Sequence, residues 1–313
     1  MIVRRRRFIT IAALCMAIAA IGSCVPTPQP VGPPQDSGVR MKIAGGEIIL
    51  QMSLDGSKVS AAAVSRYVQT AARAVSQYLA RFPVPQVAVQ VSVAGAGSEI
   101  HGKELDGTLI QLEVGPKTLD SDIDGDWTIT HEMFHLAFPQ LAERHSWMNE
   151  GLSDYLEPIS RAQIGTLTPR RIWKDFVEGM PQGLPEPGDA GLDNTHTWGR
   201  TYWGGCLYWL LADVHIREQT GNRKSLQDAI RAIVDAGGDG RVTWEISRVI
   251  EIGDRATGTT VLRDLHDQMG ARPFAPDLTA LWRRLGIVYA HGRVSFDDQA
   301  PLASIRRAMT EPQ

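Results

Sequence analysis

The sequence is poor in the features that mark several protein classes. Its 313 residues include three cysteines, 7% aromatic residues and a formal net charge of only −3. So small a charge gives no reason to expect nucleic acid as a partner, and three cysteines cannot build a disulfide-stabilised scaffold. No apolar run reaches the roughly 20 residues that a membrane-spanning helix needs. The remainder, with 43% hydrophobic residues, is typical of a globular protein with a substantial core.

The first 23 residues read as an export signal. Four arginines at positions 4–7 precede an apolar run from Phe8 to Ile21, and small residues follow. Such a run is too short for an anchor and is typical of a cleaved signal peptide, the alternative being an uncleaved N-terminal helix. The charged stretch 5–9 also resembles a twin-arginine signal, so the export route stays open between the general and the twin-arginine pathway.

The signal ends in a sequence that predicts lipidation. Ile21-Gly22-Ser23-Cys24 resembles the lipobox of bacterial lipoproteins, which implies that Cys24 carries a lipid and holds the chain on a membrane. Residues 24–40 contain five prolines and almost no large apolar side chains, which is typical of an extended tether. We therefore expect an exported, lipid-anchored protein of the bacterial cell envelope that faces the periplasm or the exterior.

The hydrophobic pattern beyond residue 41 predicts an α+β fold. Residues 41–165 show strand patterns at 42–52, 86–93 and 108–114 and a long amphipathic helix at 58–82. Residues 166–313 read as mostly helical. The sequence thus predicts a mixed-sheet N-terminal subdomain over 41–165, followed by a mainly α-helical subdomain over 166–313. Strand 108–114 could pair with an extended peptide, as edge strands beside clefts do.

Helix boundaries in the middle of the chain come from caps and prolines. Asp126 can cap a helix that runs to Phe138, and Ser146 can cap the next, which Pro158 is expected to stop. A strongly apolar helix is predicted over 201–220. It contains Cys206, which is most simply a small core residue.

Two histidines and a glutamate in the sequence Thr130-His131-Glu132-Met133-Phe134-His135 predict a metal site. Residues four apart lie on one face of a helix, so His131 and His135 can reach the same ion. Glu132 lies about 100° further round the helix, where it can act as general base toward a metal-activated water without binding the metal. Two imidazoles and one carboxylate with an open fourth position suit a single Zn²⁺ ion.

The third ligand is expected fifteen residues after His135. Glu150 lies on a separate predicted helix that an antiparallel turn would return to the first. Asp154 lies one turn later on the same face, where its carboxylate could accept the free N–H of a ligand histidine and fix its orientation.

These residues resemble those of the gluzincin zinc metallopeptidases. Asn149-Glu150-x-x-Ser153-Asp154 is similar to the thermolysin pattern, and Asn149-Glu150-Gly151 followed by Tyr155 is similar to that of the aminopeptidases. The resemblance implies a gluzincin-like fold. It implies His131, His135 and Glu150 as ligands, Glu132 as catalytic base and Asp154 as partner of a ligand histidine.

A second stretch, residues 201–226, resembles the catalytic domain of the glycyl aminopeptidase family in the same clan. Tyr202 falls at the position of that family's tyrosine, which implies that its phenol donates to the oxyanion of the tetrahedral intermediate. The sequence departs from the family pattern because Gly204 stands in place of a lysine and no Gly-x-Met-Glu-Asn segment precedes the zinc helix. His145, His196 and His215 are weaker candidates for proton donors. Residues 179–199 could form a rim or lid.

The sequence therefore supports two functional hypotheses. The first is a lipid-anchored zinc metallopeptidase that hydrolyses peptide bonds of a peptide or protein substrate, with aminopeptidase and endopeptidase action both open. The alternative is an envelope lipoprotein that binds a peptide or protein partner and carries a structural or vestigial zinc site.

Overall fold

The chain folds around a five-stranded mixed sheet, as the sequence predicts for an α+β protein. The computed structural model describes residues 38–312; the predicted export signal, Cys24 and nearly all of the predicted tether lie outside them. The first strand begins just before the expected start of the folded part. The strands are β1 (Val39–Ile43), β2 (Gly46–Ser53), β3 (Gln86–Val93), β4 (Ile100–Leu105) and β5 (Leu109–Val114).

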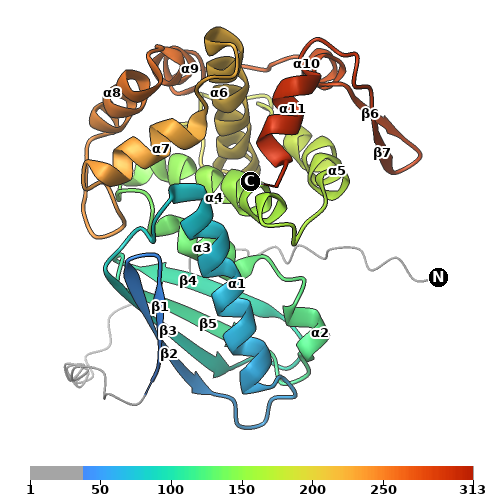
Figure 1. Cartoon of the computed structure of the whole chain (residues 1–313). Coiled ribbons are helices and arrows are strands. Elements are labelled where there is room, and N and C mark those ends of the chain that lie inside the picture. Colours follow the sequence, from blue (N-terminus) through green and yellow to red (C-terminus); the bar gives the residue numbers. More distant parts are fainter. Residues whose placement is uncertain (1–37, 313) are drawn as a thin grey trace, which may run out of the picture. The chain divides into compact units, whose positions relative to one another are not determined.

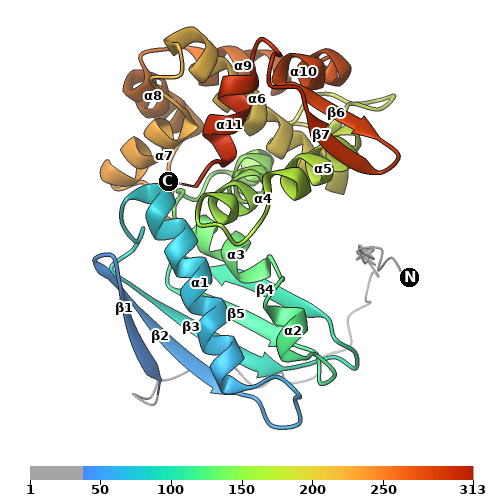
Figure 2. The same ribbon diagram turned by 45° about the vertical axis from the view of Figure 1, so that its right-hand side comes forward.

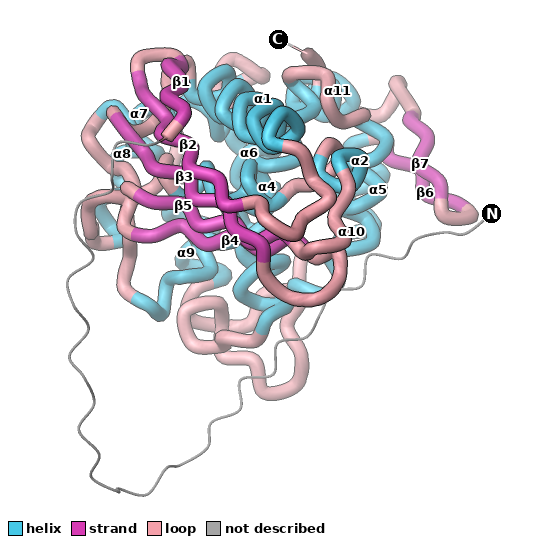
Figure 3. Tube along the Cα trace, turned by 90° about the horizontal axis from the view of Figure 1, so that it is seen from below, coloured by secondary structure: helices cyan, strands magenta, loops and turns pink. Residues whose placement is uncertain are grey.

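The strands lie side by side in the order β1-β2-β3-β5-β4 (Figure 3). β2, β3 and β5 run parallel, while β1 and β4 pair antiparallel at the two edges. Alternation in β3 places Val87, Val89 and Val91 on one buried face. Helix α1 (Ala61–Leu79) lies across the sheet in Figures 1 and 2 and buries its apolar side in the same core.

The expectation that strand 108–114 offers an edge to an extended peptide is wrong. β5 is enclosed by β3 and β4, and β4 forms the edge. The sequence did not reveal β4 because Ile100-His-Gly-Lys-Glu-Leu105 lacks a regular apolar alternation and contains a glycine. The strand is held by its complete antiparallel register with β5.

From residue 120 onward the described chain is helical apart from one hairpin. No helix among residues 38–312 is long and apolar enough to cross a membrane. The boundary predicted between residues 165 and 166 stays a prediction. The elements are α2 (Asp120–Ile123), α3 (Thr128–His135), η1 (Glu143–His145), α4 (Ser146–Gln163), α5 (Pro169–Gly179), η2 (Met180–Gly183), η3 (Arg200–Gly204), α6 (Gly205–Thr220), α7 (Leu226–Asp235), α8 (Ile246–Thr257), α9 (Val261–Met269), α10 (Leu278–Leu285), β6 (Ile287–Ala290), β7 (Arg293–Phe296) and α11 (Ala303–Thr310).

Helix α4 does not stop at Pro158, contrary to the expectation from sequence. It continues to Gln163 with Pro158 inside it. A proline inside a helix costs about 3 kcal/mol, because it removes one hydrogen bond and its ring crowds the preceding turn. The second half of α4 offsets this cost by burial, since Ile159 and Ala162 are buried in the core and Arg161 makes buried polar contacts.

Helices α4 and α6 approach each other closely at two glycines. A Cβ added to Gly151 would lie 2.2 Å from the carbonyl carbon of Gly205, and a Cβ on Gly205 would lie 2.0 Å from the carbonyl oxygen of Trp147. Side chains at either position would push the helices apart. Gly151 directly follows Glu150, so this contact also sets the position of the predicted third ligand.

We predict that Gly151→Ala destabilises the protein. The added methyl group cannot be absorbed by a flexible neighbour, because it meets backbone, and overpacking of this kind costs about 1–3 kcal/mol. Chemical denaturation measures the difference in unfolding free energy. Gly125→Ala is the control, since nothing lies within 4 Å of a Cβ there. Equal stability of the two variants would contradict the close contact.

Candidate metal centre

Three potential metal ligands meet where α3 packs against α4. His131 and His135 lie one turn apart on α3, and Glu150 lies in the first turns of α4. The Nε2 atom of His131 is 3.3 Å from Glu150 Oε2, and the Nε2 atom of His135 is 3.6 Å from the same oxygen. Among the described residues these three form one of two groups whose donor atoms lie close enough to hold a metal ion.

The donor geometry fits one tetrahedral ion. Zinc bonds of about 2.0–2.1 Å at tetrahedral angles place neighbouring donors about 3.3 Å apart, which is close to the observed separations. A hydrogen-bonded pair would lie nearer 2.9 Å. The two Nδ1 atoms face other partners, so both Nε2 atoms are directed toward Glu150. Two nitrogens and one carboxylate leave a fourth position open.

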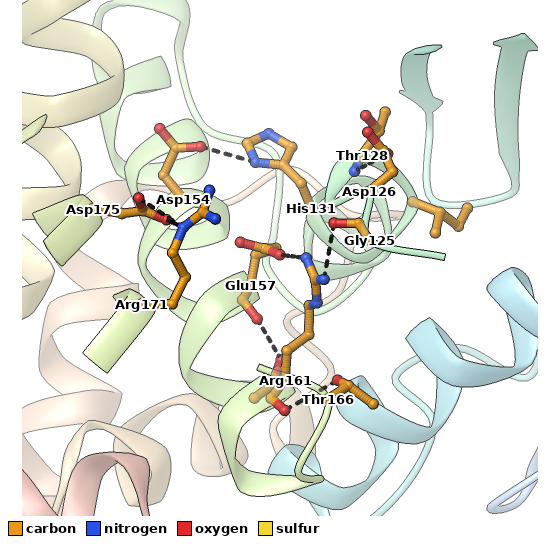
Figure 4. Close-up of polar contacts among 12 residues, drawn as sticks. Gly125, Asp126, Thr128, His131, Asp154, Glu157, Arg161, Thr166, Arg171 and Asp175 are labelled. Carbon is orange, nitrogen blue, oxygen red and sulfur yellow. Dashed lines mark hydrogen bonds and ion pairs between the residues drawn. The ribbon is translucent and has the colours of Figure 1, made fainter. Parts of the chain in front are cut away.

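The two candidate ligand histidines contact three orienting residues on α4. His131 Nδ1 lies 3.0 Å from Asp154 Oδ1, as the sequence predicts, and Figure 4 shows the two side chains pointing toward each other. His135 Nδ1 lies 2.9 Å from Asn149 Oδ1 and 3.2 Å from Ser153 Oγ. Such contacts fix the tautomer and the ring plane of a ligand histidine.

Asn149 and Ser153 are positioning residues that the sequence reasoning missed. They are four residues apart, as are Glu150 and Asp154, so two neighbouring rows on one helix serve the site. One row faces His135, and the other supplies a ligand together with the carboxylate that faces His131. The i, i+4 spacing from Asn149 was the available signal.

Charge around the buried histidine favours its protonated form when no ion is present. Burial lowers the pKa of His131, but hydrogen bonds to Asp154 and Glu150 outweigh it and raise the pKa well above its ordinary value. The same carboxylates would face a bound cation. The site is therefore built to hold positive charge in the buried space between the two helices.

Glu132, the predicted base, is fixed by the edge strand. Its Oε2 accepts a 2.8 Å hydrogen bond from the backbone N–H of Glu104 in β4. β4 passes so closely that a Cβ on Gly102 would come within 2.6 Å of the Glu132 side chain. Glu132 is buried beside the three candidate ligands and is not a member of that group. Burial also raises the pKa of Glu104, and the neighbouring charge of Glu132 adds to this.

Buried polar contacts hold the start of α3 in place relative to α1 and α4. The Tyr67 hydroxyl donates to Asp126 and accepts a 3.0 Å hydrogen bond from the N–H of Ile129 at the start of α3. In Figure 4, Arg161 of α4 lies between Glu157 and the carbonyl of Gly125. It donates a 3.2 Å hydrogen bond to that carbonyl. The two helices are thereby fixed at the end where α3 begins.

Tyr202 lies at the edge of the same site. It belongs to the π-turn η3, which packs against α4. Burial raises the pKa of its phenol, and the charges of Glu150, Asp154 and Glu132 raise it further. The hydroxyl therefore remains a donor at neutral pH. Gly204, which stands where the resembled family has lysine, is buried: a Cβ there would come within 2.8 Å of Leu192.

The second group of potential metal ligands is held together by hydrogen bonds. Asp193 lies 2.7 Å from His145 Nδ1 and 3.1 Å from His266 Nε2, and it accepts a 2.9 Å bond from Trp147 Nε1. The Nε of Arg144 donates to the other nitrogen of His145. These are hydrogen-bond separations, so His145 is held within this cluster, and a proton-donor role for it stays a prediction.

The segment that could have been a lid is fastened at several points. Of the predicted rim or lid over 179–199, residues 180–183 form η2, and residues 184–199 are called the rim segment. It contains Asp189, whose buried carboxylate lies 2.7 Å from Arg200 Nε. Asp193, further along the segment, is held by the contacts with His145, Trp147 and His266 described above. The N–H of Leu192 donates to the carbonyl of Met269. We interpret it as a fixed rim. Within the described residues, His196 and His215 make no hydrogen bond or ion pair with the site.

Comparison with known proteins identifies the fold. No protein-family model and no curated protein sequence matches this chain. An aminopeptidase N family protein from Idiomarina loihiensis superposes with a TM-score of 0.62 at 14% identity, over 80% of this chain and 49% of that one. An M1 zinc metallopeptidase from Deinococcus radiodurans superposes with a TM-score of 0.50 at 13% identity, over 76% of this chain and 52% of that one.

This likeness establishes the fold. The chain has the fold of these M1 zinc aminopeptidase structures, in agreement with the gluzincin-like architecture expected from sequence. It spans about half the length of the solved structures it matches.

We predict that zinc affinity depends on Asp154. Replacing it by asparagine removes the charged acceptor opposite His131 Nδ1, and loss of such a partner typically weakens metal binding about 10- to 100-fold. Competition with a chelating dye measures the dissociation constant. Asp175→Asn is the control, since that carboxylate pairs with Arg171 on α5. Unchanged affinity in Asp154→Asn would contradict the orienting role.

We also predict a pH-dependent contribution to stability from Asp193. Burial raises its pKa, but three hydrogen bonds outweigh burial and hold the pKa well below its usual range. Its stabilisation is therefore complete above the unfolded pKa, near 4, and is lost as the pH falls below it. Asp193→Asn should cost about 1–3 kcal/mol at pH 7, with a smaller difference at acidic pH.

Urea denaturation across this pH range measures the effect of Asp193→Asn. Asp235→Asn is the matched control, because that carboxylate is 68% exposed and lies 3.7 Å from Arg81. A cost for Asp193→Asn that does not change between pH 7 and acidic pH would contradict the ionised-acceptor interpretation.

Proposed function

We propose that the protein is a zinc-dependent peptidase with one Zn²⁺ per chain. The observation that carries this proposal is the set of three donors at metal-ligand separations with a buried carboxylate next to them and a fourth position open. Three protein ligands and an open position are the arrangement of catalytic zinc sites, whereas structural sites are closed by four protein ligands. The fold shared with M1 zinc metallopeptidases supports the same reaction class.

The ligands would be His131, His135 and Glu150. Zinc bound there would supply a Lewis acid that polarises a peptide carbonyl and makes water a stronger acid. Asp154, Asn149 and Ser153 would hold the imidazoles in the orientation that directs Nε2 to the ion, which is the role of such partners in zinc sites.

Glu132 would act as general base. The backbone N–H of Glu104 holds Oε2, which leaves Oε1 to accept a proton from the attacking water. The same carboxyl group can then give that proton to the leaving amine, which completes the transfer without a second acid. Its fixed position next to the ligands is what such a transfer needs.

Tyr202 would stabilise the developing charge on the carbonyl oxygen. Its phenol stays protonated because burial and the nearby carboxylates raise its pKa. A donor placed at the edge of the site before the reaction begins lowers the barrier by stabilising the oxyanion.

The substrate would be a peptide or protein segment in extended form. β4 is an edge strand beside Glu132. The N–H of Glu104 already binds Glu132, and we propose that the remaining outer backbone groups of β4 pair with such a segment. We propose peptide hydrolysis as the reaction class, with aminopeptidase and endopeptidase action both compatible with this site.

We further propose that the enzyme works in the bacterial cell envelope. The support is the sequence alone: an arginine-rich signal, a lipobox ending at Cys24 and a proline-rich tether. Lipid on Cys24 would place the folded part at a membrane surface without a spanning helix.

The prediction that tests the proposal is Glu132→Gln. This variant should bind zinc as the wild type does, because residue 132 is not a ligand, while peptide hydrolysis falls by at least about 10²- to 10⁴-fold. Zinc content by mass spectrometry and cleavage of a mixed peptide library measure the two properties. Glu113→Gln, an exposed position on β5, is the matched control.

Two results would count against the proposal. Retained turnover in Glu132→Gln would exclude the base. A zinc-loaded wild type that binds peptides and leaves them intact on prolonged incubation would favour the alternative, a peptide-binding lipoprotein with a structural ion.

A further inference from the structure

Two exposed tryptophans stand beside the candidate metal centre. The chain has eight tryptophans, and only Trp127 and Trp198 are exposed, by 36% and 47%. The others are buried or half-buried. Exposure of so large an apolar side chain is unfavourable unless something covers it in use, and exposed aromatic groups commonly mark binding sites.

Each exposed tryptophan touches a residue of the site. The centroids of the Trp127 and His131 rings are 5.3 Å apart, and the angle between the ring planes is 84°. The Trp198 ring stacks on Tyr202 at 5.8 Å and 29°. In both cases the tryptophan precedes its site residue by four positions. Trp198 thus turns a face toward Tyr202, whereas Trp127 meets His131 in a T-shaped contact, and part of each indole is open to solvent.

The two tryptophans come from different walls of the site. Trp127 precedes α3, and Trp198 precedes η3; both helical segments pack against α4, which carries Glu150. The rim segment that carries Trp198 is fastened through Asp189 and Asp193. Trp198 is thus presented on an ordered support, which lowers the entropic cost of binding against it.

The carboxylates around the site already have partners. Glu132 accepts from the N–H of Glu104, Asp154 faces His131, and the carboxyl group of Glu104 accepts from the N–H of Gly107. Glu150 is a proposed ligand. The surface that the two walls offer to a substrate side chain is therefore formed by the indole rings and not by an unpaired carboxylate. Apolar and aromatic side chains suit such a surface because their burial is favourable and needs no counter-ion.

We propose that Trp127 and Trp198 are specificity-determining residues that bind large apolar or aromatic side chains flanking the scissile bond. The inference rests on the proposed peptidase function and names its substrate class: peptides with residues such as phenylalanine or leucine next to the cleaved bond. Trp198 also covers one face of Tyr202, so substrate binding on this wall lies next to the proposed oxyanion donor.

The test compares matched peptides that carry phenylalanine or alanine beside the cleaved bond. Trp127→Ala and Trp198→Ala should each raise KM for the phenylalanine peptide about tenfold, with kcat nearly unchanged, since loss of one aromatic contact of about 1.4 kcal/mol is a factor of ten. KM for the alanine peptide should change little. Trp198→Phe should restore most of the loss.

Tyr289→Ala is the matched control. Tyr289 is an aromatic side chain with 41% exposure on the β6–β7 hairpin, which lies away from α3 in Figure 1. Its removal should leave KM and kcat for both peptides unchanged. Circular dichroism and thermal unfolding of each variant separate local loss of binding from loss of fold.

A binding measurement separates this inference from the proposed function. In the Glu132→Gln background, the same peptides are titrated by isothermal calorimetry, with and without Trp198→Ala. Suppose that the wild type cleaves neither peptide, and that the phenylalanine peptide still binds in a way that depends on Trp198. The proposed function is then wrong, and the inference holds.

Three outcomes would overturn the inference. The first is an equal change in KM or in kcat for both peptides in the tryptophan variants. A fall in kcat alone would mean that Trp198 positions Tyr202. The second is a preference for lysine or arginine beside the cleaved bond. The third is tryptophan-dependent binding of oligosaccharides but not of peptides.

Discussion

The packing of α4 against α3 is the contact on which the rest of the site depends. α3 supplies two imidazoles one turn apart, and α4 supplies Glu150 together with the side chains that orient both rings. A shift of about 1 Å between these helices would separate the donors, so the contact has to be rigid. The Arg161–Gly125 bond fixes it near the start of α3, and the close approach of Gly151 to Gly205 fixes α4 from the other side.

Residues from other segments surround this contact and complete the candidate site. β4 holds one oxygen of Glu132, and the π-turn before α6 brings Tyr202 to the edge of the same space. The rim segment is fastened by Asp189 and Asp193, so the wall that carries Trp198 is an ordered surface. The candidate ligands and base lie on α3 and α4, the proposed oxyanion donor lies on η3, and the two exposed tryptophans precede α3 and η3. Both α3 and η3 pack against α4, which brings these residues to one place.

The sequence predicted the parts of this arrangement that local periodicity records. Helical spacing identified His131, His135 and the Glu150–Asp154 pair as residues on common faces, and alternation identified β3. It failed where tertiary contacts decide. β4 has no clear alternation and exists through its register with β5, and α4 runs through Pro158 because buried side chains offset the cost of the proline. Asp193 could not be predicted, because its partners lie 46 or more residues away in the sequence.

Anomalous diffraction from crystals of the zinc-loaded protein, collected on both sides of the zinc absorption edge, is the most direct measurement. We expect one anomalous peak per chain, bonded to the Nε2 atoms of His131 and His135 and to the Glu150 carboxylate, with no protein atom in the fourth position. A zinc ion bound instead by His145, Asp193 and His266, or a fourth protein ligand that closes the site, would contradict a catalytic metal centre between α3 and α4.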